Sequence, residues 1–329
     1  MAEREHPRAG EIDGASPGEG LKLVHTECAV CHAQDAAFEA SGRDFEHNTV
    51  PGEFRFVRCR RCDHLYLNPR PAIRDVARTY PPDYYAYSTG GNRLAARLRR
   101  MREARKVRLY REAIGEGSRR ILEIGCGNGR FLSLLREYGC AEWELTGIDF
   151  SESAVRQCQA LGIRATATRV EDLAAEDGTY DAILMMQLIE HLEDPRRSCE
   201  RVRALLHPGG VFILETPNVG GLDYRLFRGR WWAPYHFPRH WNLFSNTGLQ
   251  RLLHETGFTV LRTDSLINTS SWIVSLHNLF LDRGYPEWLV RLCHFQNPAL
   301  LPPFVLIDFV RLRLGLGTSD QRVIARRAP

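Results

Sequence analysis

The fold of this chain is decided by the stretch Arg120–Leu135, which reads RILEIGCGNGRFLSLL. An apolar strand here runs into a glycine-rich turn and then directly into an amphipathic helix. Gly125, Gly127 and Gly129 let the backbone turn tightly and approach a ligand. Their G-x-G-x-G spacing differs from the dinucleotide pattern G-x-G-x-x-G, and a glycine turn alone also fits a plain strand-to-helix connection. The stretch therefore predicts a nucleotide-binding turn, for which further residues must supply the evidence.

Two carboxylates narrow the choice of nucleotide. Glu123 ends a buried strand, where a carboxylate is costly unless it meets a cationic or hydrogen-bonding partner such as an amino-acid ammonium. Asp149 ends a second predicted strand, Trp143–Ile148, at about the interval where a ribose-binding acid follows the glycine turn in doubly wound folds. A ligand with an amino-acid end and a ribose is S-adenosylmethionine rather than a nicotinamide dinucleotide.

Four segments together resemble the class I S-adenosylmethionine-dependent methyltransferases. They are ILEIGCGNGRFLSLL, GIDFS at Gly147–Ser151, YDAILMMQLIEHLEDP at Tyr180–Pro195 and LLHPGGVFILETPN at Leu205–Asn218. Within that class, EHLEDP and PGGVFILETPN are most similar to the group of ubiquinone-pathway O-methyltransferases and sugar methyltransferases. The resemblance covers roughly residues 119–264. It implies an α/β fold with a Rossmann-like, seven-stranded methyltransferase sheet, and it says little about the acceptor.

The same resemblance implies which residues contact S-adenosylmethionine. The glycine turn is expected on the methionine and ribose side, Asp149 at the ribose hydroxyls and Met186 at the methionine end. Phe150 is expected on the adenine face, although core packing is an alternative for an aromatic side chain. The predicted cofactor contacts are Glu123, Gly125, Cys126, Gly127, Gly129, Asp149, Phe150, Val170, Glu171, Asp172, Met186 and Gln187.

Two histidines are candidates for the proton acceptor. The sulfonium already makes the methyl group electrophilic, so the protein mainly aligns the reactants and removes a proton from the acceptor. Imidazole suits general-base work near neutral pH, which points to His191 and His240. His191 has an alternative role in holding the turn after the fourth strand by hydrogen bonding.

Both histidines lie in motifs that depart from those of the relatives. Ubiquinone-pathway enzymes have Glu, Glu and His, a set associated with a divalent metal, where this chain has Gln187, Glu190 and His191. His240 lies in a segment that resembles the catalytic motif of deoxysugar C-methyltransferases, but Arg239 stands where Glu is typical. The sequence leaves open which histidine is the base and whether a divalent metal takes part.

Four N-terminal cysteines have the spacing of a metal site. They are arranged as Cys28-x-x-Cys31 and Cys59-x-x-Cys62, and two such pairs can present four thiolates to one Zn²⁺. With all four positions filled by sulfur, the site would be closed and structural. The segment also resembles the zinc-binding leader that precedes some members of this methyltransferase group. Unpaired or oxidised cysteines are the alternative.

The length of 329 residues and the hydrophobic content of 43% fit one catalytic domain with appendages. The predicted organisation is a disordered tail at 1–20, a zinc-ribbon-like leader at 21–72, a linker with a basic helix at 73–117 and the methyltransferase domain at 118–329. The basic segment Arg93–Arg111 could place Leu94, Leu98, Met101, Val107 and Tyr110 on one helical stripe. It is interpreted as a helix over the cofactor site, with a nucleic-acid or anionic-membrane contact as the alternative.

Capping residues, glycines and prolines in the core segment predict where its helices and strands begin and end. A helix begins at Ser151 or Glu152 and stops near Gly162, and another begins at Asp194-Pro195 with the aspartate as cap. A third helix is expected at Gly248–Thr256 after a cap at Ser245–Thr247. The expected strands after the first two are Ile163–Thr168, Tyr180–Met186, Val211–Glu215 and Phe258–Thr263. The resemblance adds a final antiparallel strand at Arg322–Arg326.

This assignment leaves 264–320 as an unusually apolar insertion between the last two strands. Its apolar runs are shorter than the ~20 residues that a membrane-spanning helix needs. They are expected to form a lid over the acceptor site, with a peripheral membrane contact as the alternative.

The function predicted from the sequence is O-methylation of a small molecule, a sugar, or a glycan or lipid-linked acceptor. Nucleic-acid methylation, deoxysugar C-methylation and non-catalytic cofactor binding are the alternatives. A formal net charge of +4 does not by itself imply a polyanionic partner, and the basic run lacks interleaved stacking aromatics. The first twenty residues do not read as a secretory leader, so a cytoplasmic location is expected. The acceptor, the pathway and the oligomeric state are not predicted.

Overall fold

The computed structural model describes residues 20–81, 93–294, 297 and 299–329. The predicted disordered tail, apart from Gly20, lies outside the described residues. The chain divides into two compact units. We call them the leader unit, residues 1–81, 218–248 and 267–320, and the sheet unit, residues 82–217, 249–266 and 321–329. The segments 218–248 and 267–320, expected in the methyltransferase domain, thus pack with the leader.

The sheet unit contains a mixed sheet with, among the described residues, seven strands. They are β6 (Arg119–Ile124), β7 (Trp143–Asp149), β8 (Arg164–Ala167), β9 (Tyr180–Met186), β10 (Leu206–Pro217), β12 (Phe258–Leu266) and β13 (Asp320–Arg327). Their order across the sheet is β12, β13, β10, β9, β6, β7 and β8. The pairs from β10 to β8 are all parallel. The predicted Rossmann-like methyltransferase sheet is confirmed.

The last strand runs against its neighbours. The backbone N–H of Ala328, just after β13, donates to the carbonyl of Gly257, just before β12. At the other end, the Gln321 side chain donates to the carbonyl of Pro217, the last residue of β10. The end of β13 thus lies beside the start of β12, and its start lies beside the end of β10, as expected for an antiparallel insertion.

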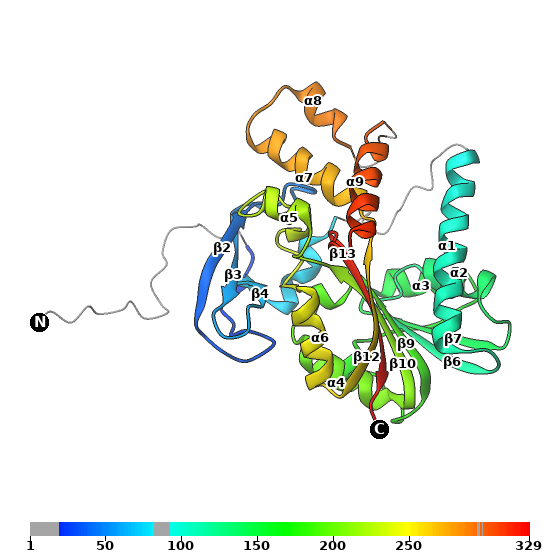
Figure 1. Ribbon diagram of the computed structural model, residues 1–329. Coiled ribbons are helices and arrows are strands. Elements are labelled where there is room, and N and C mark those ends of the chain that lie inside the picture. The colour runs from blue at the N-terminus through cyan, green and yellow to red at the C-terminus, as the bar shows by residue number, and fades with distance from the viewer. Residues whose placement is uncertain (1–19, 82–92, 295–296, 298) are drawn as a thin grey trace, which may run out of the picture. The chain divides into compact units, whose positions relative to one another are not determined.

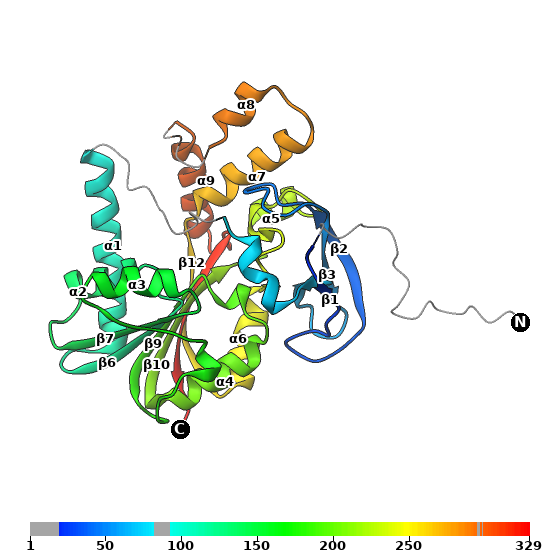
Figure 2. The same ribbon diagram turned by 180° about the vertical axis from the view of Figure 1, so that it is seen from behind.

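Helices cover both faces of this sheet. They are α1 (Arg93–Ile114), α2 (Arg130–Tyr138), α3 (Glu152–Ala160), α4 (Pro195–Leu205) and α6 (Asn246–Glu255). Figures 1 and 2 show α1, α2 and α3 on one face and α4 and α6 on the other. Ser151 caps α3 and Asp194 caps α4, each accepting a backbone N–H in the first turn. The predicted Asp194 cap is therefore confirmed, α3 begins at Glu152 as one of its two expected starts, and α6 begins before the expected Gly248.

Helix α1 buries only part of the stripe expected from its sequence. Val107, Tyr110 and Ile114 lie in the core with residues of α2 and the central strands. Met101, by contrast, is 61% exposed, so its predicted place on the buried stripe is wrong. The side chains of Leu94 and Leu98 lie outside the described part of the chain.

The leader unit has two small sheets. One pairs β1 (Leu23–Val24) with β5 (Arg70–Pro71), and the other is antiparallel. The second sheet has the order β11 (Asn242–Leu243), β4 (Leu65–Leu67), β3 (Phe54–Cys59) and β2 (Ala36–Gly42). Because β11 comes from the middle of the chain, this segment completes the sheet that the leader begins.

The described residues of the insertion add three helices to the leader unit: α7 (Thr269–Asp282), α8 (Glu287–Leu292) and α9 (Leu301–Arg313). Short helical segments at η1 (Ile73–Thr79), α5 (Leu222–Phe227) and η4 (Ala233–Tyr235) complete the unit. Trp272 of α7 stacks on Phe304 of α9, with ring centroids 5.5 Å apart. Part of the apolar surface of the insertion is therefore buried within its own unit. Among the described residues, no helix is both long enough and apolar enough to cross a membrane.

Candidate functional site

The glycine turn after β6 has a backbone that other residues rarely adopt. Gly125, Gly127 and Gly129 have φ angles of 75°, 51° and 78°. A Cβ on Gly125 would lie 2.9 Å from Leu188 Cδ2, and one on Gly129 would lie 2.7 Å from Cys158 Sγ. The turn therefore requires glycine for its conformation and, at two of these positions, for the space beside it.

Asp149 ends β7 and holds the same turn. Its Oδ2 accepts the backbone N–H of Gly127 at 2.9 Å, and its Oδ1 accepts that of Ser151 at 2.9 Å. Burial raises the pKa of Asp149, whereas these backbone hydrogen bonds lower it. The carboxylate thus stands at the carboxyl edge of the sheet beside the glycine turn, the place expected of a ribose-binding acid.

Glu123 is buried at the end of β6, on the strand that pairs with the strand of Asp149. β6 and β7 pair in parallel with Glu123 opposite Gly147, two residues before Asp149. Burial raises the pKa of Glu123 to about 8, while Lys106 lowers it and Asp149 raises it further. Its buried Oε2 has no hydrogen-bond partner among the described residues. An unpaired buried carboxyl of this kind fits an incoming ammonium group, such as that of S-adenosylmethionine.

The other predicted cofactor contacts lie at the ends of neighbouring strands. β9 pairs with β6 and ends at Met186, and Gln187 follows with a positive φ of 52°. β8 pairs with β7, and the short helix η2 (Val170–Asp172) follows it. Because the carboxyl ends of parallel strands share one edge, the sheet brings these segments to the edge that carries Asp149.

Individual side chains at this edge differ in how accessible they are. Phe150 is 52% exposed, so core packing does not explain it. Val170 and Cys126 are buried, and burial raises the pKa of the Cys126 thiol well above its ordinary value. Glu171 accepts a hydrogen bond from Ser198 and pairs with Arg169 at 3.4 Å. Phe150 is therefore an exposed aromatic side chain at this edge and is open to an adenine ring.

A charged network near the glycine turn was missed by the sequence analysis. Glu215 near the end of β10 accepts hydrogen bonds from Lys106 and Tyr110 of α1, and Arg322 of β13 lies 3.5 Å from it. Arg322 also donates to Asp264 at 2.9 Å. These partners are more than one hundred residues from Glu215 in the chain, except for Asp264, so no local pattern could have paired them.

His191 lies in the sheet unit, in the turn after β9. It closes the short helix η3 (Ile189–His191), and its backbone N–H donates to the carbonyl of Leu188. Its neighbour Glu190 is fully buried and accepts a hydrogen bond from Thr216 at 2.9 Å. Burial raises the pKa of Glu190 to about 8.

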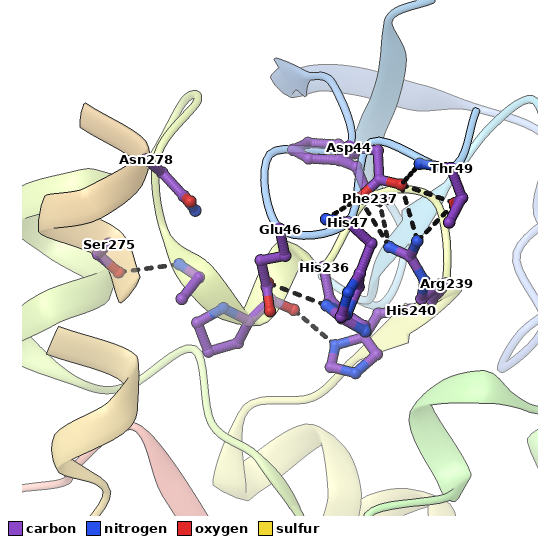
Figure 3. Close-up of polar contacts among 12 residues, drawn as sticks. Asp44, Glu46, His47, Thr49, His236, Phe237, Arg239, His240, Ser275 and Asn278 are labelled. Carbon is purple, nitrogen blue, oxygen red and sulfur yellow. Dashed lines mark hydrogen bonds and ion pairs between the residues drawn. The ribbon is translucent and has the colours of Figure 1, made fainter. Parts of the chain in front are cut away.

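His240 lies in the leader unit, on the loop after η4 (Figure 3). Its Nδ1 is 2.7 Å from the backbone carbonyl oxygen of Pro234. A carbonyl only accepts, so Nδ1 carries the hydrogen, and Nε2 is the ring nitrogen that can take up a proton. The preceding Arg239 is buried and pairs with Asp44, with N–O distances of 2.9 and 2.7 Å. Arg239 therefore has a structural partner and does not supply the acid–base group found at this position in the C-methyltransferase motif.

The four predicted metal ligands lie together in the leader unit. Cys28 Sγ is 3.5 Å from Cys62 Sγ, and Cys31 Sγ is 3.5 Å from Cys59 Sγ. All four sulfur atoms lie within 4.8 Å of one another. This spacing fits four thiolates around one tetrahedral metal ion. The other five cysteines are free, and four of them are buried.

Comparisons with known proteins agree with this geometry. A methyltransferase-domain family matches residues 92–263, just over half of the chain. A ubiquinone biosynthesis O-methyltransferase of Coxiella burnetii is 30% identical over 171 residues, covering 46% of this chain and 72% of that protein. The chain belongs to the class I S-adenosylmethionine-dependent methyltransferases.

More distant similarities concern shorter segments or the fold alone. A ubiquinone biosynthesis O-methyltransferase of Parvibaculum lavamentivorans is 34% identical over 122 residues, covering 35% of this chain and 45% of that protein. The chain spans about half the length, or less, of several such relatives. Among solved structures, a geranyl diphosphate methyltransferase in complex with S-adenosylmethionine has a TM-score of 0.48 at 17% identity, covering 75% of this chain and 92% of that one. A methyltransferase from Archaeoglobus fulgidus has a TM-score of 0.45 at 21% identity, covering 69% and 94%.

Proposed function

We propose that this protein transfers the methyl group of S-adenosylmethionine to a hydroxyl oxygen of a small molecule, sugar or lipid-linked glycan. The observation that carries the proposal is the pair Glu123 and Asp149 beside the glycine turn, with one Glu123 oxygen unpaired among the described residues and placed for an ammonium, and with Asp149 placed for a ribose. O-methylation, rather than transfer to another atom, is supported by the names of the curated relatives. Gly125, Cys126, Gly127, Gly129, Phe150, Val170, Glu171, Asp172, Met186 and Gln187 complete the proposed cofactor site.

In this reaction the protein must align the acceptor hydroxyl with the methyl group of the cofactor and accept the hydroxyl proton. S-adenosylmethionine supplies an electrophilic methyl carbon, whose bond to sulfur breaks as the bond to the acceptor oxygen forms. The hydroxyl proton passes to an imidazole, and His240 is the proposed base because its Nδ1–H is held by a backbone carbonyl. His191 is the second candidate, and a purely structural role in its turn is the alternative.

The cofactor assignment is tested by Asp149→Ala. The variant loses two charge-assisted hydrogen bonds to ribose, each worth roughly 1.5–3 kcal/mol, so the Kd for S-adenosylmethionine should rise at least tenfold. Asp177→Ala serves as the control, because Asp177 lies outside the proposed cofactor contacts and pairs with Arg201 at 2.8 Å, so this variant should leave the Kd unchanged. Titration calorimetry that gives the same affinity for Asp149→Ala as for the native protein would contradict the ribose assignment.

The acceptor and the base are tested by labelling. Incubation with methyl-labelled S-adenosylmethionine and fractionated extract should label a small-molecule or glycan fraction that resists nuclease treatment. His240→Ala should lower the rate of labelling at least a hundredfold while leaving cofactor affinity unchanged, the usual scale of a general base. An unchanged rate would transfer the role to His191, for which His191→Ala is the matching variant. Label found only in RNA would overturn the proposed acceptor class.

We also propose that Cys28, Cys31, Cys59 and Cys62 hold a structural Zn²⁺. The four sulfur atoms fill every position of a tetrahedral site, so the ion would stabilise the leader and would not meet the acceptor. Metal analysis of the purified protein should find about one zinc per chain, and the Cys59→Ser variant should retain much less. The lid role of 264–320, its peripheral membrane contact and the cytoplasmic location stay predictions.

A further inference from the structure

The loop that carries His240 is held in place by the hairpin between β2 and β3 of the leader (Figure 3). Asp44 of this hairpin forms the two hydrogen bonds to Arg239, and both side chains are almost fully buried. Asp44 also accepts the backbone N–H and the hydroxyl of Thr49, each at 2.8 Å. The hairpin thus fixes the segment next to His240 through a satisfied, buried ion pair.

A second carboxylate of the hairpin contacts a histidine of the same loop. Glu46 Oε1 is 2.9 Å from His236 Nδ1. A carboxylate only accepts, so His236 carries its hydrogen on Nδ1. The ring of His236 lies 4.9 Å from that of His240, centroid to centroid, with 59° between the planes. Glu46, His236 and His240 therefore form a continuous row of a carboxylate and two imidazoles.

The backbone of His236 has a conformation that is rare for a residue other than glycine. Its φ of 39° lies in the left-handed region, which non-glycine residues seldom occupy and which clusters at functional sites. A small cavity beside it is lined also by Glu46, Trp232 and Asn278. Asn278 Oδ1 is buried and has no hydrogen-bond partner within the described part of the chain. The recess beside Glu46 and His236 thus offers an acceptor to a hydroxyl group or a water molecule.

We infer that Glu46 is a positioning residue for the acid–base site, acting on His240 through His236. This inference rests on the proposed role of His240 as the base. The Glu46 carboxylate fixes the Nδ1–H form of His236 and the orientation of its ring. Because the His236 ring lies 4.9 Å from that of His240, this contact restrains the ring beside the proposed base. The leader hairpin would then contribute to catalysis as well as to stability.

The charge balance around His236 supports this assignment. The titratable and charged groups around it are Arg43, Asp44, Glu46, His47, Arg239 and His240. Arg239 is neutralised by Asp44, so the charge of Glu46 is the one that faces His236 directly. Desolvation acts to raise the pKa of Glu46, but His236 and then His47 lower it below its ordinary value. Glu46 is therefore ionised at neutral pH, as the inference requires.

The experiment uses the full chain labelled with ¹⁵N at histidine. In the native protein, the ring signals of His236 should show a proton on Nδ1. In Glu46→Ala, the fraction of His236 with its hydrogen on Nδ1 should fall, and Glu46→Asp should restore part of it. The Nδ1–H form of His240 should persist in both variants, because it depends on the Pro234 carbonyl.

Glu53→Gln is the matched control, since Glu53 belongs to the same hairpin but pairs with Arg230 at 2.8 Å. It should leave the His236 signals unchanged. The labelling assay should show about a tenfold lower kcat in Glu46→Ala, with cofactor affinity unchanged. His236 signals that are the same in Glu46→Ala as in the native protein, or that move equally in Glu53→Gln, would overturn the inference. Absence of methyl transfer by the native protein would instead count against the proposed function, and the signals would still test the contact.

Discussion

Glu123 shows how a single residue in this fold is set up for a ligand. Its carboxyl is buried at the end of β6, near Asp149 and with one oxygen unpaired. A raised pKa means that the folded chain holds a proton that the unfolded chain releases. Glu123 therefore lowers stability as the pH rises from its ordinary pKa to about 8. A cationic ligand removes this cost because it lets the carboxyl ionise in place.

We expect S-adenosylmethionine binding to release about one proton at pH 7, because the ammonium lowers the pKa of Glu123 from about 8 to below the working pH. Calorimetry in buffers with different ionisation enthalpies measures this number directly. Affinity should rise with pH up to about 8 and level off above it. In Glu123→Gln the proton release should disappear, and proton release equal to that of the native protein would show that another group is responsible.

At the scale of the element, the hairpin between β2 and β3 depends on one buried ion pair. Asp44 has 1% of its side chain exposed and Arg239 has none. Burial alone would raise the pKa of Asp44, but the hydrogen bonds and charge of Arg239 lower it to about 2. The stabilisation from this ionised carboxylate is therefore present above the ordinary pKa of aspartate, near 4, and is lost as the pH falls toward 2.

Asp44→Asn should destabilise the leader unit by about 3–5 kcal/mol, because it leaves the Arg239 guanidinium buried without its counter-charge. Urea unfolding followed by tryptophan fluorescence measures the change. Asp63→Asn is the control, since Asp63 also pairs with an arginine, Arg58, but has 72% of its side chain exposed. That variant should lose less than about 1 kcal/mol. Equal losses in the two variants would mean that burial of the pair does not decide its strength.

At the scale of the whole molecule, two units have separate cores and separate proposed ligands. One core packs the aromatic side chains of the leader with those of 218–248 and α7. The other packs α1, α2 and α3 on the central strands. The proposed zinc ligands lie in the first unit, and the proposed cofactor contacts lie in the second.

Zinc and cofactor should therefore act on different unfolding transitions. At one hundred times its Kd, S-adenosylmethionine should stabilise the sheet unit by about 2.7 kcal/mol. Chelation of zinc, or Cys59→Ser, should lower the transition of the leader unit and change cofactor affinity by less than about twofold. Differential scanning calorimetry with each ligand alone separates the two effects. Loss of cofactor binding on chelation would contradict this separation.

Local patterns predicted much of the sheet unit. The strand Tyr180–Met186 has the expected bounds, because Gly178 precedes it and its apolar run Ala182–Met186 ends at the polar Gln187. The cap Asp194 was predicted correctly because a short polar side chain at the start of a helix satisfies its first free N–H groups. The expected strand Ile163–Thr168 is shorter in the structure, and Val211–Glu215 belongs to a longer one. The end of a strand depends on its hydrogen bonds to the neighbouring strand, whose residues are distant in the sequence. A short stretch of sequence therefore does not specify that end.

The sequence by itself determined the glycine turn, the order of the strands and helices in the sheet unit, and the placing of Glu123 and Asp149 near one another. Each of these depends on backbone conformations and apolar periods that short stretches of chain specify. Only the tertiary structure decided that 218–248 and 267–320 pack with the leader, that Lys106 pairs with Glu215, and that Glu46 reaches His236. These outcomes depend on burial and charge balance among residues far apart in the chain, and such free energies exist only once the backbone has brought the partners together.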